Sequence, residues 1–268
     1  MGNGKAQALI TGASAGIGAE FARQLAAKGY DLILVARRRD RLEKMAESLR
    51  GQYPINVEVF PADLSVQTDI ESLEHRISEL ENLEVLVNNA GFGVPGTFIE
   101  TEMDAILSMV NVHVIATIRL TRSALPGMIQ RGRGFVIQVS STSAFSASTG
   151  SPTYGATKAY LNSFTDGLVT ELYGTDVHVQ ALCPGFTHTE FHDSPEYEKF
   201  KIKQRIPEIM WMRADQVVRG SLRAIQRGSG IYVPGVGNKL IAIIGSLGLT
   251  RLLINIYLAI FRKGPMAS

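Results

Sequence analysis

Tyr154 and Lys158 are the two residues whose types and spacing best suit proton transfer. They are four positions apart in a predicted helix, so their side chains share one face. A free tyrosine has a pKa near 10 and is a poor base at neutral pH. A neighbouring ammonium favours the phenolate, and lowering that pKa by ~3 units requires about 4 kcal/mol of differential stabilisation. We therefore expect Tyr154 to act as a general acid and base with Lys158 beside it.

The spacing alone does not single out this pair, because Tyr197 and Lys201 repeat it. That second pair lies in a charged stretch, which is typical of a solvated surface. Tyr154 is followed by three small residues and preceded, thirteen to fourteen positions upstream, by Ser140 and Ser141 at the end of an apolar run. Either serine hydroxyl fits a hydrogen bond to a substrate oxygen.

A glycine-rich segment follows the first apolar run and opens the first predicted helix. A turn without side chains lets backbone N–H groups approach a pyrophosphate, and the helix N-terminus favours its charge. The glycine spacing differs from the usual G-x-G-x-x-G, and a tight turn between strand and helix remains the alternative. The candidate phosphate-binding residues are Gly12, Ser14, Ala15, Gly16, Ile17 and Gly18.

Three consecutive arginines, Arg37 to Arg39, follow the second apolar run. Many dinucleotide-binding folds place an acid there to bind both ribose hydroxyls. Guanidinium groups instead suit a 2′-phosphate, which an acid would repel. A solvated basic helix start is the alternative, but arginine at a helix N-terminus opposes the helix dipole unless an external anion is present. Arg37 and Arg38 therefore predict NADP(H) rather than NAD(H).

These candidates must be positioned by alternating strands and helices. Most of the apolar runs are nearly continuous, as expected for strands buried on both faces of a parallel sheet. The pattern predicts an α/β fold, a Rossmann-type doubly wound parallel sheet of about seven strands with helices on both faces. The predicted strands are Gln7–Thr11, Asp31–Ala36, Asn56–Pro61, Glu84–Asn88, Gly134–Ser140, Asp176–Cys183 and Ile231–Val233. The predicted helices are Gly16–Lys28, Arg39–Gly51, Val66–Glu81, Glu102–Gln130, Pro152–Tyr173 and Ala214–Arg227.

Composition limits the other classes of function. The 268 residues suffice for one large domain, which we place at 1–236. A net charge of +2 argues against nucleic acid as a partner. Cys183 is the only cysteine and fits a reducing, cytoplasmic compartment. The five histidines show no paired ligand spacing, so we expect no metal site.

Several of these motifs together resemble the short-chain dehydrogenase/reductase family, over about residues 5–235. They occur in the family's order and at its spacing. The motifs are Thr11-Gly12-x3-Gly16-Ile17-Gly18, Asp63-Leu64, Asn88-Asn89-Ala90-Gly91, Asn111, Ser141, Tyr154-x3-Lys158 and Pro184-Gly185-x3-Thr189. The nearest likeness is to 3-oxoacyl, hydroxysteroid and carbonyl reductases that prefer NADP.

The resemblance assigns a role to each matching residue. Tyr154 would exchange the substrate proton, and Ser141, chosen over Ser140 by the family's thirteen-residue gap, would bind the carbonyl oxygen. Lys158 would bond the nicotinamide ribose and lower the tyrosine pKa. Asn111 would hold a water that continues the proton relay. The implied cofactor contacts further include Asp63, Leu64, Asn89, Ala90, Gly91, Pro184, Gly185, Thr187 and Thr189.

Each of these residues taken singly has a structural alternative. Asn89 fits an Asx turn at a strand end, and Asp63 fits a helix cap. Asn111 could be a polar helix residue without a role in catalysis, and Pro184-Gly185 could simply form a turn in a loop. The alternatives together would require several independent coincidences.

Residues 186–213 form a long connection between the sixth predicted strand and the helix from Ala214. Long loops of this kind are often lids or binding segments. We expect this lid to close over an apolar ketone or alcohol. The alternative is that its apolar residues only pack the lid onto the rest of the domain. Those residues are Phe191, Tyr197, Phe200, Ile202, Ile206, Ile209, Met210, Trp211 and Met212.

Residues 237–268 form an apolar extension, predicted helical, whose most apolar part is 240–261. Arg251 interrupts it, so no uncharged run reaches the ~18 residues of a typical transmembrane helix. Three interpretations remain: packing on the body or on a second subunit, a peripheral membrane anchor, or a true span. Arg262 and Lys263 would suit anionic headgroups.

The sequence thus predicts an NADP-dependent enzyme that interconverts a small-molecule ketone and a secondary alcohol. A cofactor-binding sensor or structural subunit that has lost turnover is the alternative, which the intact Ser141, Tyr154 and Lys158 disfavour. The family resemblance further implies a homodimer or homotetramer through the helices that carry Asn111 and Tyr154.

Overall fold

The computed structural model describes residues 4–145, 151–193 and 206–247. Its main sheet has seven strands in the order β3-β2-β1-β4-β5-β6-β9, and every neighbouring pair is parallel. The order reverses between β1 and β4, which makes the carboxyl ends of those strands a switch point where ligands bind. The predicted doubly wound fold is confirmed. The strands are β1 (Gln7–Thr11), β2 (Asp31–Ala36), β3 (Val57–Pro61), β4 (Leu83–Asn88), β5 (Gly134–Val139), β6 (Val177–Leu182) and β9 (Ile231–Tyr232).

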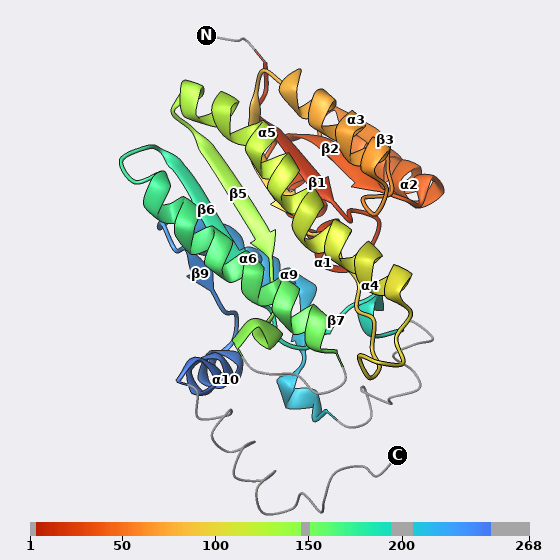
Figure 1. The fold of residues 1–268 in the computed structure, drawn as a ribbon. Helices are drawn as coiled ribbons and strands as arrows, with labels where there is room; N and C mark the ends of the chain where they lie inside the picture. The colour runs from red at the N-terminus through yellow and green to blue at the C-terminus, as the bar shows by residue number, and fades with distance from the viewer. Residues whose placement is uncertain (1–3, 146–150, 194–205, 248–268) are drawn as a thin grey trace, which may run out of the picture.

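Helices cover both faces of the sheet, because its central strands are apolar on both sides. All six residues of β4 are buried. On one face the strands pack against α1, α2 and α9, and on the other against α3, α5 and α6 (Figure 1). The helices are α1 (Gly16–Ala27), α2 (Arg39–Gln52), α3 (Gln67–Ser78), α4 (Met103–Val110), α5 (Ala116–Arg131), α6 (Pro152–Glu171), α9 (Ala214–Ile225) and α10 (Val236–Ser246). Each predicted strand and helix of the core is present, within a few residues at either end.

The predicted single helix at 102–130 is wrong in one detail. A π-helical turn, Asn111–Ile115, separates α4 from α5, and the Ala116 N–H donates to the carbonyl of Asn111 five residues earlier. The combined stretch Met103–Arg131 is long and apolar enough to cross a membrane by composition. Its buried residues Leu120 and Met128 pack against the sheet, so the apolar character serves the core. π-turns within helices are frequent at functional sites.

The two ends of the predicted lid 186–213 lie together. A short strand β7 (Thr187–His188) pairs in parallel with β8 (Met212–Arg213), an element that the sequence pattern did not predict. Two 3₁₀ turns, η3 (Glu190–Asp193) and η4 (Glu208–Met210), flank this pair. Residues 194–205, which include the Tyr197–Lys201 pair, lie outside the described residues.

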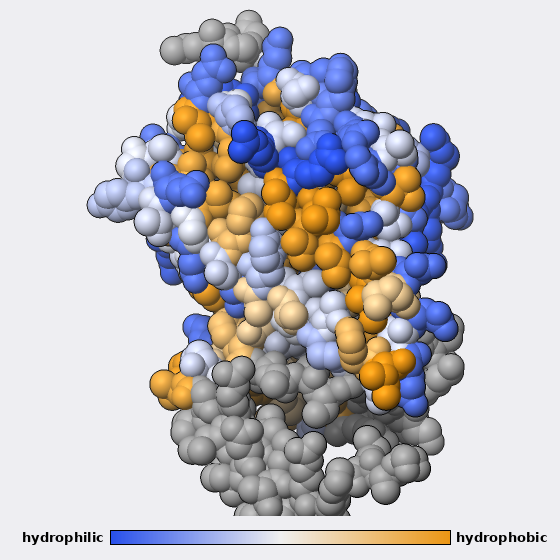
Figure 2. Space-filling model, viewed as in Figure 1, coloured by the Kyte–Doolittle hydropathy of each residue, from blue (hydrophilic) through white to orange (hydrophobic). Residues whose placement is uncertain are grey.

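The C-terminal extension, which we place at 237–268, overlaps with α10, whose first residue is Val236. The helix lies at the carboxyl edge of the sheet, beside the 3₁₀ turn η2 (Thr142–Phe145) (Figure 1). Figure 2 shows hydrophobic surface where α10 lies. The exposed apolar side chains of this helix and its end are Val236, Leu240, Ile241, Ile243, Ile244 and Leu247. Residues 248–268 lie outside the described residues, so the partner of this apolar face stays a prediction.

Gly18 in α1 tests how closely this helix approaches the end of β1, and Gly167 in α6 serves as the control. A Cβ on Gly18 in α1 would lie 2.4 Å from the carbonyl oxygen of Gly12, whereas a Cβ on Gly167 in α6 meets nothing within 4 Å. We expect Gly18→Ala to destabilise the fold by about 1–3 kcal/mol through overpacking. Gly167→Ala should stabilise it by about 0.5–1 kcal/mol through helix propensity. Urea denaturation measures both, and equal effects would contradict the close approach.

Candidate active site

The predicted catalytic residues meet at the carboxyl edge of the sheet. Ser141 lies two residues after the end of β5, and the polypeptide then passes through η2 to α6, which carries Tyr154 and Lys158 one turn apart. Figure 1 shows the end of β5, η2 and the first turns of α6 on this edge. The structure therefore brings together three side chains that the sequence separates by up to 17 positions.

Tyr154 is surrounded by Lys158, Ser141 and two aromatic rings. The ammonium nitrogen of Lys158 lies 5.6 Å from the centre of the phenol ring. The rings of His113 and Phe191 lie 5.7 and 6.1 Å away, centre to centre. Burial raises the pKa of Tyr154 to about 12, although a hydrogen bond with Ser141 lowers it. Without cofactor the phenol is thus firmly protonated.

The two candidate serines have different partners. The Ser140 side chain is buried, and its hydroxyl donates to the backbone carbonyl of Lys158 at 2.9 Å. Ser141 is only partly buried, and its hydroxyl accepts from the Ser143 N–H at 3.1 Å and bonds Tyr154. Ser140 therefore anchors α6 to the end of β5, whereas Ser141 faces the phenol. The geometry favours Ser141 as the serine that meets a substrate oxygen.

Lys158 is deeply buried, with only 4% of the residue exposed. Its ammonium donates to the Val139 carbonyl at 2.9 Å. Burial lowers the pKa of Lys158 to about 7, although the thiolate form of Cys183 would act against this. In the cofactor-free protein the burial of the pair penalises both charged forms, so a tyrosine pKa lowered by Lys158 together with the charged nicotinamide stays a prediction.

His113 is a buried residue of this site that the sequence analysis missed. Its Nε2 accepts from the Phe92 N–H at 3.2 Å, so the ring proton lies on Nδ1, 2.9 Å from the Thr157 hydroxyl. Thr157 in turn donates to the Tyr154 carbonyl at 2.8 Å. Burial and the nearby Lys158 cation hold the pKa of His113 well below its usual range. A neutral imidazole thus ties the π-turn to the helix that carries the tyrosine.

Gly91 belongs to the same cluster. A Cβ there would lie 2.7 Å from His113 Nε2 and 3.6 Å from the Lys158 nitrogen. The sequence showed His113 two residues after Asn111 in an apolar helix, and only the tertiary contact with the 90–92 segment reveals its role. Ala90 is tied to the same edge, because its N–H donates to the Thr11 hydroxyl at 2.9 Å.

Asn89 braces the glycine-rich turn rather than pointing to open space. Its amide donates to the carbonyls of Thr11 and Gly12 at 2.9 and 3.3 Å. A Cβ on Gly12 would lie 2.7 Å from that amide, and one on Gly18 would lie 2.4 Å from it. These two glycines are required so that β1, β4 and α1 converge at one point.

The start of α1 fits a phosphate group. No side chain caps the helix at Ala15, and its first turn carries no acidic residue, so its N-terminal amides face no side-chain anion of their own. Gly16 has a φ of +56°, a conformation that suits glycine, and a Cβ there would meet the Thr189 side chain at 3.1 Å. Gly12 and Ser14 to Gly18 therefore form the turn that the sequence predicted, with Ile17 packed against the core.

Asp63 lies two residues after β3, and its contact with the cofactor adenine stays a prediction. Burial alone would raise the pKa of Asp63, but hydrogen bonds from Ser65 and the nearby Arg37 outweigh burial and lower it. Arg37 approaches the carboxylate at 3.7 Å, and Leu64 is buried in the core. The Asn111 amide donates to the Ser65 carbonyl at 3.2 Å. The predicted water relay through Asn111 stays a prediction.

Arg38 links two segments that are far apart in sequence. Its guanidinium donates to the Ser14 hydroxyl at 3.0 Å and to the Glu190 carboxylate at 3.2 Å. Arg41 also donates to Glu190, at 2.7 Å. Three arginines rather than an acid follow β2 directly, but the fold supplies a carboxylate there from the lid. No local pattern around Glu190 indicates this contact.

The remaining predicted cofactor residues line the start of the lid. The Pro184 carbonyl accepts from the Thr142 N–H at 2.9 Å, which joins the loop after β6 to η2. The Thr187 hydroxyl donates to the Gly185 carbonyl at 3.1 Å, and Thr189 lies beside Gly16. These contacts place the 184–189 segment between the glycine-rich turn and η2.

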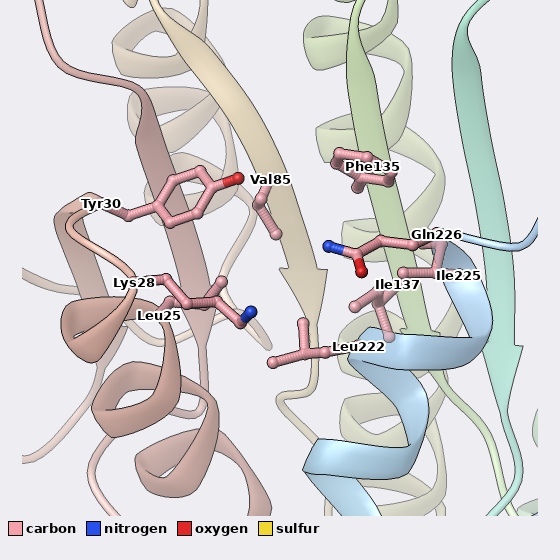
Figure 3. A pocket seen from close by; sticks show the side chains of 9 residues that line it. All are labelled: Leu25, Lys28, Tyr30, Val85, Phe135, Ile137, Leu222, Ile225 and Gln226. Carbon is pink, nitrogen blue, oxygen red and sulfur yellow. The ribbon is translucent and has the colours of Figure 1, made fainter.

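A small cavity elsewhere has no part in this site. Figure 3 shows it between the end of α1 and α9, with Tyr30 and Lys28 on one side and Leu222 and Gln226 on the other. Tyr30 donates to Glu84 at 2.7 Å there. None of the predicted site residues lines this cavity. Within the described residues there is also no cluster of three or more groups suited to hold a metal ion.

Comparisons with known proteins identify the family of the chain. The family model described as short chain dehydrogenase matches residues 6–198. The chain belongs to the short-chain dehydrogenase family. It is 32% identical over 229 residues to a very-long-chain 3-oxoacyl-CoA reductase of Phaeosphaeria nodorum, an alignment that covers 83% of this chain and 64% of that relative. The chain spans 53 to 64% of the length of three such reductases.

Two solved structures match almost the entire chain. A short-chain dehydrogenase from Sphingobium yanoikuyae in complex with NADPH has a TM-score of 0.80 at 30% identity and covers 98% of each chain. A bulky-bulky ketone specific alcohol dehydrogenase from Comamonas testosteroni has a TM-score of 0.77 at 28% identity and covers 100% of this chain and 97% of its own.

The buried Lys158 predicts a pH-dependent cost to stability. Its pKa is about 7 in the fold and near 10.5 in the unfolded chain, so the unfolded chain binds the extra proton between these values. Wild-type stability should therefore rise with pH across that window. Lys158→Met removes this cost, and we expect the cofactor-free variant to be more stable at pH 7 by on the order of 3 kcal/mol.

Urea denaturation from pH 6 to 10 tests this expectation. The advantage of Lys158→Met should be largest at or below pH 7 and shrink toward pH 10. Lys44→Met, at an exposed position of α2, is the control and should show no such trend. A Lys158→Met variant that is no more stable than wild type at pH 7 would contradict the claim that burial of the Lys158 ammonium destabilises the fold.

Proposed function

We propose that this protein is an NADP(H)-dependent oxidoreductase that interconverts a ketone and a secondary alcohol. The observation that carries the proposal is the meeting of Tyr154, Ser141 and Lys158 beside an uncapped, glycine-rich helix start at one edge of the sheet. The nicotinamide would supply the hydride chemistry when bound. The residues of the chain bind, orient and transfer the proton.

The proton step follows from the positions of the site residues. Ser141, already hydrogen-bonded to the phenol, would hold the substrate oxygen against Tyr154. With a pKa near 12 the phenol is a donor at neutral pH, which suits protonation of the oxygen during ketone reduction. Lys158, whose pKa is about 7, can change its protonation state near neutrality and would supply the replacement proton from behind the ring.

The preference for NADP(H) rests on the basic residues beyond β2. Arg37, Arg38 and Arg41 lie at the carboxyl end of β2, and Arg38 also contacts the glycine-rich turn through Ser14. A 2′-phosphate placed among these guanidinium groups would form charge-assisted, bidentate hydrogen bonds. The Sphingobium relative was solved with NADPH.

The substrate class is proposed to be apolar. Phe191 from the lid lies beside the Tyr154 ring, and the relatives include enzymes named for very-long-chain 3-oxoacyl-CoA and for bulky ketones. Some apolar residues of the lid pack within the lid. Trp211 is only 8% exposed and its ring lies 5.4 Å from that of Phe186, so it packs the lid onto itself. Phe191 is therefore the described lid residue best placed to meet substrate.

A homodimer or homotetramer remains part of the proposal. Apolar side chains are exposed along the helices that carry the π-turn and the tyrosine, and Figure 2 shows hydrophobic surface on this side. A second subunit would cover them. The exposed residues are Met103, Leu107, Ile115, Ile129, Tyr160 and Val169.

Replacing the phenol tests the catalytic assignment. Tyr154→Phe removes the proton donor but keeps the ring contacts, so turnover should fall by about 10²–10⁴-fold while NADPH affinity stays close to wild type. Tyr160→Phe on the same helix is the control and should retain activity. Steady-state reduction of a ketone and direct NADPH titration measure the two effects. A Tyr154→Phe variant with wild-type turnover would exclude the assignment, and a wild-type chain that binds NADPH without turning over any ketone would favour the silent sensor.

A series of ketones of rising chain length tests the substrate class. If the lid buries the substrate's apolar part, kcat/KM should rise by up to about fourfold per methylene until the cleft is full. The measurement is NADPH oxidation by the wild-type enzyme. Efficiency that does not change with apolar size would remove the apolar substrate while leaving the reaction class intact.

A further inference from the structure

Glu190 occupies the guanidinium groups that the proposed cofactor phosphate would need. Its carboxylate accepts from Arg41 at 2.7 and 2.8 Å and from Arg38 at 3.2 Å. Arg38 simultaneously donates to Ser14 in the glycine-rich turn at 3.0 Å. One lid carboxylate thus joins the start of α2 to the start of the lid, 149 to 152 positions apart.

We propose that Glu190 is a specificity-determining residue that competes with the 2′-phosphate of NADP(H) for Arg38 and Arg41. This inference rests on the proposed cofactor. A carboxylate and a phosphate monoester seek the same bidentate donors, and two anions cannot share them without strong repulsion. Binding NADP(H) must therefore displace Glu190, whereas NAD(H), which lacks the phosphate, leaves the ion pairs in place.

The three charged side chains are exposed enough to exchange partners. Their side chains are 43% exposed for each arginine and 53% for Glu190, so solvent screens the pairs and rearrangement is inexpensive. The neighbouring hydrogen bonds and charges of Arg41 and Arg38 lower the pKa of Glu190, which keeps it ionised at neutral pH. The competitor is thus always charged under working conditions.

The position of Glu190 couples this exchange to the lid. Glu190 opens η3 directly after Thr189, whose side chain lies against Gly16 in the glycine-rich turn. Phe191, the next residue, has its ring 6.1 Å from that of Tyr154. Displacing the Glu190 carboxylate would therefore act on the lid segment that contacts both the cofactor turn and the catalytic tyrosine.

Glu190→Gln tests the competition by removing the negative charge at constant size. We expect its Kd for NADPH to fall by about fivefold, the scale of one exposed charge pair, and its Kd for NADH to stay within about twofold of wild type. Glu190→Asp, which keeps the charge, should stay near wild type. Glu208→Gln is the matched control, since Glu208 lies in the same lid but pairs with His188. Calorimetric titration of the cofactor onto each full-length protein gives the Kd values without any need for turnover.

The outcomes separate the inference from the proposed function. Selective tightening of NADPH by Glu190→Gln supports the competition. Equal changes for NADPH and NADH, weaker binding of both, or no change would overturn it, because Glu190 would then close over any dinucleotide or take no part. If the wild-type chain binds neither dinucleotide, the cofactor proposal itself fails.

Discussion

Two strands that are separated by some 70 residues must meet at the carboxyl edge of the sheet with almost no space between them. Asn89, after β4, donates to the carbonyls of Thr11 and Gly12 after β1, and any side chain at Gly12 or Gly18 would collide with it. The close approach aims the start of α1 at the switch point of the sheet. The orientation of the proposed phosphate turn follows from this contact.

A second constraint is the cost of burying ionisable groups near that contact. Lys158, His113 and Tyr154 are packed together, and burial drives each toward its neutral form. Each is nevertheless hydrogen-bonded: the lysine to the end of β5, the imidazole to Phe92 and Thr157, and the phenol to Ser141. Hydrogen bonds therefore fix the positions of these three side chains, while burial favours their uncharged forms. Of the three groups, only Lys158, with a pKa of about 7, changes its protonation state near neutral pH.

The outer part of the site differs from the buried part, because its side chains are charged and exposed, and their ion pairs can change partners. Arg37 meets Asp63, while Arg38 and Arg41 meet Glu190. Exposed ion pairs contribute little to stability. In our proposal these pairs act in selectivity, because they compete for the guanidinium groups that would bind a cofactor phosphate. The buried inner site would then serve proton transfer and the solvated outer site cofactor discrimination.

The sequence by itself determined the fold class and most elements. Continuous apolar runs can be buried only between two helical layers, and the glycine turn, the arginines after β2 and the Tyr154–Lys158 spacing are local patterns that depend on few neighbours. Helix ends shifted by a few residues, and the π-turn at Asn111 was not predicted, because such details depend on packing. Only the tertiary structure decided that Ser140 anchors a helix while Ser141 faces the phenol, that His113 supports the site, and that Glu190 reaches Arg38 and Arg41. Those roles arise from contacts between segments far apart in the chain, and from burial, which no local spacing encodes.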